Sequence, residues 1–198
     1  SLSEEYSTNE DILRLFYETE KLTIKGLRSI SKITGRIPVG DVVNKETGEV
    51  VLESGNEITE DLAEIICKCG LKKLEVVKED SDPLILNTLQ NDNTSNHKEA
   101  LQLMYLRLRP GNPYQEDQAK KLIQEKFFDE NRYQLGKVGR FRMNRKFGTD
   151  VPEDVLVLKV EDIINSYKYI MALRARKGEV DDIDHLGNRR IRTIAEFA

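Results

Sequence analysis

The stretch that decides the fold is DVVNKETGEVVLESGNEITEDLAEIICKCGLKKLEVV, residues 41–77. Branched apolar residues flank a turn that runs from Asn44 to Gly48, and this arrangement predicts a hairpin. Thr59 can cap a helix that Gly70 ends, after which the sequence returns to a strand pattern. A hairpin, a helix and a strand in so short a length predict a compact β-rich module.

The rest of the chain is mostly helical in pattern, because apolar residues recur there at helical spacing. Helices are predicted at 8–19 (opened by Ser7 or Thr8), 97–109, 114–128 and 161–178. VLVLKV, residues 155–160, instead predicts a strand. In the last helix we expect an inward apolar face made of Ile163, Ile164, Tyr167, Ile170, Met171 and Leu173. The predicted fold class is α+β, with a mostly helical core and a small β-rich inserted module.

The composition fits one domain of ordinary size or two small ones, with 33% charged and 38% hydrophobic residues. The net charge of -4 conceals a basic region. Residues 97–148 carry twelve Lys/Arg against six Asp/Glu. A localised basic face indicates an anionic partner, although a solvated helix surface explains the same charges equally well.

The expected compartment is the cytoplasm. No apolar run approaches the ~20 residues of a membrane span, and no signal peptide opens the chain. Cys67 and Cys69 are too few and too close for a disulfide framework, which favours a reducing environment. A structural zinc needs four ligands, so these two cysteines do not predict a metal site.

GEVDDIDHLGNRRIR, residues 178–192, brings acids and arginines together around a glycine. Asp182 and Asp184 could hold Mg²⁺, but no third acidic ligand or phosphate loop accompanies them. They could instead pair with Arg189 and Arg192 and lock the turn. As a third alternative, the acids and arginines supply acceptors and donors to an unpaired base. The residues alone leave internal pairing and base binding open, and no motif predicts independent enzymatic activity.

A second basic stretch reads LGKVGRFRMNRKFG, residues 135–148. Arg140 and Arg142 flank a phenylalanine, a mixture of cations and rings that single-strand grooves use. We therefore expect both arginines to contact nucleic acid. Arg109 ends a helix before PGNP, where it suits the helix dipole. It becomes a DNA contact only if its loop meets residues 178–192 in space.

Three motifs together resemble the β subunit of bacterial DNA-dependent RNA polymerase, in the C-terminal part of its lobe, or β2 domain. They are LRPGNP (108–113), KFFDENRYQLGKVGRFRMNRKFG (126–148) and GEVDDIDHLGNRRIR (178–192). The resemblance is dense over residues 81–198 and looser near the first predicted helix.

The resemblance implies a division of the chain into three parts. Residues 1–21 are the N-terminal helical part of the lobe, and residues 81–198 are its C-terminal part. Residues 22–80 are similar to the β–β′ modules that occur as lineage-specific insertions in the large polymerase subunits.

The resemblance also implies site residues. The lobe of this family is a wall of the main channel, which holds downstream duplex DNA and the non-template strand. Asp184 and Arg189 match residues that line a pocket for an unpaired non-template guanine, and Asp182 matches a neighbouring residue. Arg109 matches an arginine at the non-template strand, and Arg192 a residue that supports the loop.

The implied role is non-catalytic. The chain would be a fragment of a nucleotidyltransferase without activity or cofactor of its own, because the other large subunit holds the catalytic magnesium. DNA, the α, β′ and ω subunits and a sigma factor would be its partners in the cytoplasm, at the nucleoid. The alternative is a protein-interaction module, in which residues 22–80 dock a transcription regulator or another subunit. The acidic N-terminal region favours such protein contact.

Overall fold

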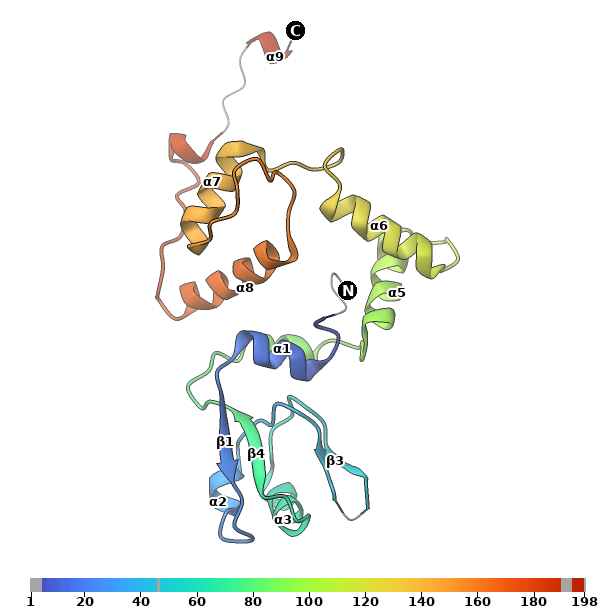
Figure 1. Cartoon of the computed structure of the whole chain (residues 1–198), viewed down its shortest axis with the longest axis vertical. Coiled ribbons are helices and arrows are strands. Elements are labelled where there is room, and N and C mark those ends of the chain that lie inside the picture. Colours follow the sequence, from blue (N-terminus) through green and yellow to red (C-terminus); the bar gives the residue numbers. More distant parts are fainter. Residues whose placement is uncertain (1–4, 46, 190–193, 198) are drawn as a thin grey trace.

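The computed structural model describes residues 5–45, 47–189 and 194–197. Its elements from the N-terminus are α1 (Asn9–Phe16), β1 (Thr19–Thr23), α2 (Ile30–Ile33), β2 (Val42–Val43), β3 (Val50–Leu52), α3 (Glu60–Lys68) and β4 (Lys73–Val77). They continue with α4 (Leu84–Gln90), α5 (His97–Leu108), α6 (Glu116–Phe128), α7 (Gly136–Phe147), α8 (Val160–Arg174), the 3-10 turn η1 (Leu186–Asn188) and α9 (Ile194–Phe197). The α+β prediction is confirmed. The strands lie at one end of the molecule and helices α5 to α8 at the other, with α1 between them (Figure 1).

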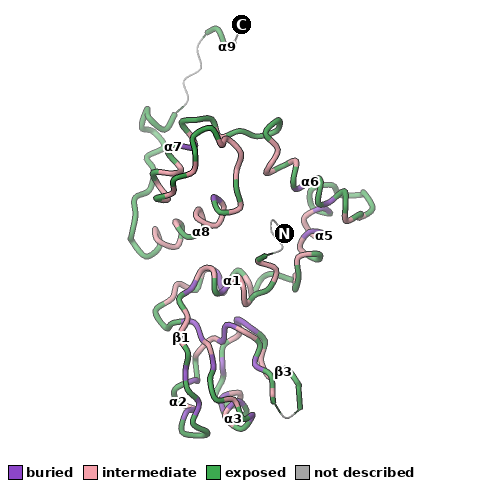
Figure 2. The backbone as a smooth tube through the Cα atoms, in the orientation of Figure 1, coloured by how far each residue is buried: buried purple, intermediate pink, exposed green. Residues whose placement is uncertain are grey.

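The β part consists of two antiparallel pairs, β1 with β4 and β2 with β3. The predicted hairpin is confirmed: Asn44 N–H donates to the Glu49 carbonyl at 2.9 Å, and Gly48 has a φ of 74°. One core fills the space between β1, β4, α2 and α3, where buried backbone is concentrated in Figure 2. Its buried members are Leu22, Ile24, Ile33, Val42, Ile58, Ala63, Ile66, Leu74 and Val76.

The predicted helix starts are confirmed by their capping bonds, whereas the helix predicted at 8–19 ends at Phe16, because the backbone at Tyr17 is extended, and the helix predicted at 161–178 ends at Arg174. Thr8 Oγ1 accepts from Asp11 N–H at 3.2 Å and opens α1. Thr59 Oγ1 accepts from Leu62 N–H at 3.5 Å and opens α3, and Gly70 follows that helix with a φ of 69°. Each hydroxyl satisfies an N–H group that the helix itself leaves unbonded.

A second core joins the β part to the helical part. It contains Leu13 and Tyr17 from the α1 region and Ile85 and Leu86 from α4, with Met171 of α8 packed against it. The Tyr17 hydroxyl donates to the Asp82 carbonyl and accepts from two N–H groups at the start of α4, at 3.2 and 3.4 Å. Burial raises the pKa of Tyr17. α5 and α6 form a separate cluster around the buried Leu101, Tyr105, Ala119 and Ile123.

Two sequence predictions for the C-terminal part are wrong. Residues 155–160 form no strand, because their carbonyls are bound by an arginine side chain described below. The apolar face of α8 is not buried: Tyr167 is 49% and Ile170 45% exposed, and Asp162 is the buried residue of that helix. α8 contacts the rest of the described chain at separate points along its length: Asp162 at its start, Tyr167 against the Phe16 ring, Tyr169, Met171, and Arg174, which pairs with Asp82. None of the described helices is both long and apolar enough to span a membrane.

Candidate nucleic-acid interface

The basic stretch 135–148 forms a helix, α7. No acidic residue occurs in it. Gly148 ends the helix with a φ of 65°, and the Asn144 side chain donates to the Val151 carbonyl at 2.6 Å. These bonds turn the chain back toward α8, and the C-terminal segment leaves the end of α8 and runs up beside α7 (Figure 1).

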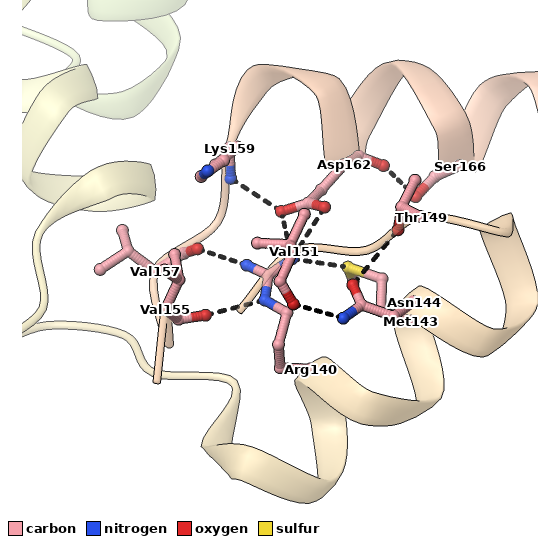
Figure 3. Close-up of polar contacts among 10 residues, drawn as sticks. All are labelled: Arg140, Met143, Asn144, Thr149, Val151, Val155, Val157, Lys159, Asp162 and Ser166. Atoms are coloured by element: carbon pink, nitrogen blue, oxygen red, sulfur yellow. Dashed lines mark hydrogen bonds and ion pairs between the residues drawn. The ribbon is translucent and has the colours of Figure 1, made fainter. Parts of the chain in front are cut away.

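Arg140 is the inward-facing cation of α7, and its side chain is fully buried. Its Nη1 donates to both carboxylate oxygens of Asp162, each at 2.9 Å. Nε donates to the Val155 carbonyl at 2.8 Å and Nη2 to the Val157 carbonyl at 2.6 Å (Figure 3). The expectation that Arg140 contacts DNA is therefore wrong, because its donors are committed inside the protein.

Asp162 has a second role at the start of α8. Its Oδ2 also accepts from the Lys159 N–H at 2.9 Å (Figure 3). A carboxylate in the first turn of a helix is stabilised by the positive end of the helix dipole. The Arg140–Asp162 pair thus fixes α7, the 155–159 connection and the start of α8 to one another.

Another part of the α7 surface holds the C-terminal segment, residues 178–189. Lys146 forms an ion pair with Asp181, and its Nζ lies 4.8 Å from the centroid of the Tyr169 ring. The Tyr169 hydroxyl donates to the Glu179 carbonyl at 2.8 Å and accepts from the Glu179 N–H at 3.2 Å. The beginning of the segment is therefore anchored to both α7 and α8.

The end of the segment is anchored by Arg142, which donates to the Asn188 side-chain oxygen at 2.7 Å. Asn188 Nδ2 in turn donates to the Asp182 carbonyl at 2.6 Å. Asp182 Oδ1 accepts from the Asp184 N–H at 2.9 Å, which closes a local turn. Arg142 thus braces a folded loop, a role that the sequence analysis did not foresee.

The predicted site residues Asp182 and Asp184, between these anchors, and Arg189, directly after the second anchor, are exposed. Within the part of the chain that the structure describes, neither aspartate forms an ion pair with Arg189. The alternative that Asp182 and Asp184 lock the turn by pairing with Arg189 is therefore not what the structure shows. Arg192 lies outside the described residues.

Arg109 is exposed and follows α5. The turn between α5 and α6 that contains it lies on the opposite side of the view from the 186–188 turn (Figure 1). The structure does not bring Arg109 to the segment, so the condition for a shared site is not met in this chain.

The anchoring residues Lys146 and Tyr169 were missed from the sequence. Lys146 had a signal, since it follows Arg142 by four positions and so shares its face of α7. Tyr169 had none, because its contact depends on the chain turning back after α8. No three His, Cys, Asp or Glu side chains among the described residues gather to hold a metal ion.

Comparison with known proteins adds independent information. A family model described as RNA polymerase Rpb2, domain 2, matches residues 52–192. DNA-directed RNA polymerase subunit beta from Rhodopirellula baltica is 48% identical over 204 residues, covering 100% of this chain. The corresponding proteins from Christiangramia forsetii and Leptospira biflexa are 39% and 36% identical, each covering 96% of this chain. The chain spans 16% of the length of these relatives.

Proposed function

The chain belongs to the RNA polymerase Rpb2, domain 2 family, and on that premise we propose that it is the C-terminal part of the lobe of a bacterial polymerase β subunit and contacts DNA. The whole polymerase would transfer nucleotides, with its magnesium held by the other large subunit. This chain would supply no catalytic group. Residues 22–80 would be a module inserted between two lobe parts, 1–21 and 81–198. DNA, the α, β′ and ω subunits and a sigma factor would be its partners.

The observation that supports DNA contact is an exposed segment held at both ends. Residues 179 and 188 are tied to α8 and α7, while Asp182, Asp184 and Arg189 between and beside them are exposed. A segment anchored in this way loses little conformational entropy when it binds a ligand. An unpaired guanine offers N–H donors to a carboxylate and the acceptors N7 and O6 to a guanidinium. Asp184 and Arg189 supply those two complementary groups.

The phosphates of the same strand would be held by α7. Lys137 and Arg145 are exposed on this helix, and neither forms an ion pair in the described residues. Arg142 contributes by holding Asn188 rather than by free contact. Arg109 would belong to a separate contact on another part of the lobe surface.

The test measures base preference in a polymerase that carries the Asp184→Ala change. The lifetime of promoter complexes is compared for guanine and thymine at one unpaired non-template position. Loss of the carboxylate is expected to reduce the guanine advantage by on the order of 1–3 kcal/mol. Asp154→Ala is the matched control, because Asp154 is an exposed carboxylate outside the segment. An unchanged guanine advantage in Asp184→Ala would contradict the proposal.

A further inference from the structure

A second basic surface lies in the β part, at the end of the molecule away from α7 (Figure 1). We call it the basic tip, and it consists of Lys21, Lys25, Arg28, Lys32, Lys72 and Lys73. Two chain segments form it: Thr23 of β1 lies opposite Lys73 of β4, and the Ile24 N–H donates to the Lys72 carbonyl at 3.0 Å. We propose that the basic tip docks an extended acidic segment of a protein partner.

Little acidic charge lies in the chain segments that form the basic tip. All six side chains are exposed, and none forms an ion pair in the described part of the chain. The sequence contains no acidic residue from Lys21 to Gly40. Glu75 lies opposite Lys21, but its carboxylate is bound by Arg14 at 3.0 Å and Thr19 at 2.9 Å. Glu75 also interacts electrostatically with Lys21, so the other five cations are the ones most available to a carboxylate-bearing partner.

The backbone of β1 offers a matching template. Ile24 N–H bonds to Lys72 and Lys78 N–H bonds to Glu18, so the even-numbered residues of β1 pair with β4. The N–H and C=O groups of Thr19, Lys21 and Thr23 consequently point away from β4. In the described structure β4 is the strand paired with β1. Such an edge can accept an added strand, which binds through main-chain hydrogen bonds.

Two further features favour a protein segment over nucleic acid. Leu27 is 55% exposed and lines a hollow of about 760 Å³ together with polar and cationic residues, so that one apolar side chain of a partner can pack on Leu27 while its carboxylates meet the cations. No aromatic residue occurs at 18–36 or 70–78, although single-strand sites use rings on which bases stack. Five of the six cations are lysines, whereas planar recognition of phosphates and bases favours arginine.

The test uses the full chain and a fluorescent synthetic peptide in which glutamates alternate with valine and leucine. Binding is followed by fluorescence anisotropy at low ionic strength. The double change Lys25→Glu/Lys32→Glu is expected to weaken binding about tenfold or more, because several ion pairs become repulsive. Lys126→Glu/Lys168→Glu is the matched control, since it alters net charge equally at exposed lysines of α6 and α8, outside both proposed binding surfaces, and should leave peptide binding unchanged. Leu27→Ser is expected to weaken binding about threefold to tenfold by removing the apolar anchor.

The outcomes separate this inference from the proposed DNA contact, on which it does not depend. Peptide binding that is equal in both double variants would overturn the basic tip as the docking surface. Single-stranded DNA of the same charge is tested in parallel. If it bound as tightly as the peptide and lost affinity in Lys25→Glu/Lys32→Glu, the inference that the partner is a protein would be wrong. A peptide methylated on alternate backbone nitrogens should bind more weakly, and equal binding would overturn the pairing with β1.

Discussion

Removal of the Asp162 carboxylate is expected to destabilise the chain by about 3–5 kcal/mol. Arg140 and Asp162 are 0% and 2% exposed, and the two bonds between them measure 2.9 Å each. Deleting one partner of a buried ion pair leaves the other charge without compensation, which is the source of that cost. The Asp162→Ala change also removes the acceptor of the Lys159 N–H at the start of α8, a loss of about 1 kcal/mol.

The measurement is urea unfolding of the full chain, followed by circular dichroism, as a double-mutant cycle of Asp162→Ala and Arg140→Met. Each single change leaves the other buried charge without its partner. The double variant is therefore expected to lose about 2 kcal/mol less free energy of unfolding than the sum of the two single losses. Asp154→Ala, an exposed carboxylate, should stay within about 0.5 kcal/mol of the wild type. Additive single effects, within about 0.5 kcal/mol, would refute the reasoning. Should Asp162→Ala fail to fold, the same cycle is run with Asp162→Asn.

Three further changes test other contacts. Arg142→Ala should raise the hydrogen-exchange rate of the Asn188 amide about fivefold, because an exposed hydrogen bond contributes about 1 kcal/mol; an unchanged rate would mean that Arg142 does not brace the segment. Tyr17→Phe should lower the free energy of unfolding by about 1–3 kcal/mol, since it leaves two N–H groups of α4 without their acceptor. The Arg174 hydrogen bond holds the pKa of Asp82 below its usual range. The stability that the Asp82–Arg174 interaction contributes is therefore fully present above the unfolded pKa of about 4, and it is lost as the pH falls through the lower pKa of the folded state. Unfolding at pH 7 and at about pH 3 should show a smaller acid loss in Asp82→Asn than in the wild type; equal losses would contradict this.

Local chemistry explains which parts of the fold could be predicted. The caps at Thr8 and Thr59 and the turn at Gly48 depend on residues three to five positions apart, and all were predicted. The strand predicted at 155–160 failed because its branched residues fit a strand while its carbonyls bind Arg140, a partner fifteen or more positions away. The sequence pattern indicates burial and local backbone geometry. It does not show that the side chain of a distant arginine will bind the carbonyl groups that a neighbouring strand would otherwise bind.

The same limit applied to the candidate site. A run of cations indicates where positive charge gathers but not which cation turns inward, so Arg140 and Arg142 were given one role. The helix gives them different faces: Arg140 is buried against Asp162, and Arg142 reaches Asn188. Arg142, Lys137 and Arg145 are exposed, whereas Lys146 is half-buried between Asp181 and the Tyr169 ring.

This division of faces links the buried pair to the exposed segment. Arg140 sets where α7 lies relative to α8, and both helices then hold residues 178–189 through Lys146, Tyr169 and Arg142. The spacing between the anchors is therefore determined by a contact that no ligand can reach. A binding segment placed on two helices is positioned more precisely than a free loop, because its ends inherit the rigidity of the helices. The buried ion pair is thus part of the geometry of the candidate site, although it contributes no group to its surface.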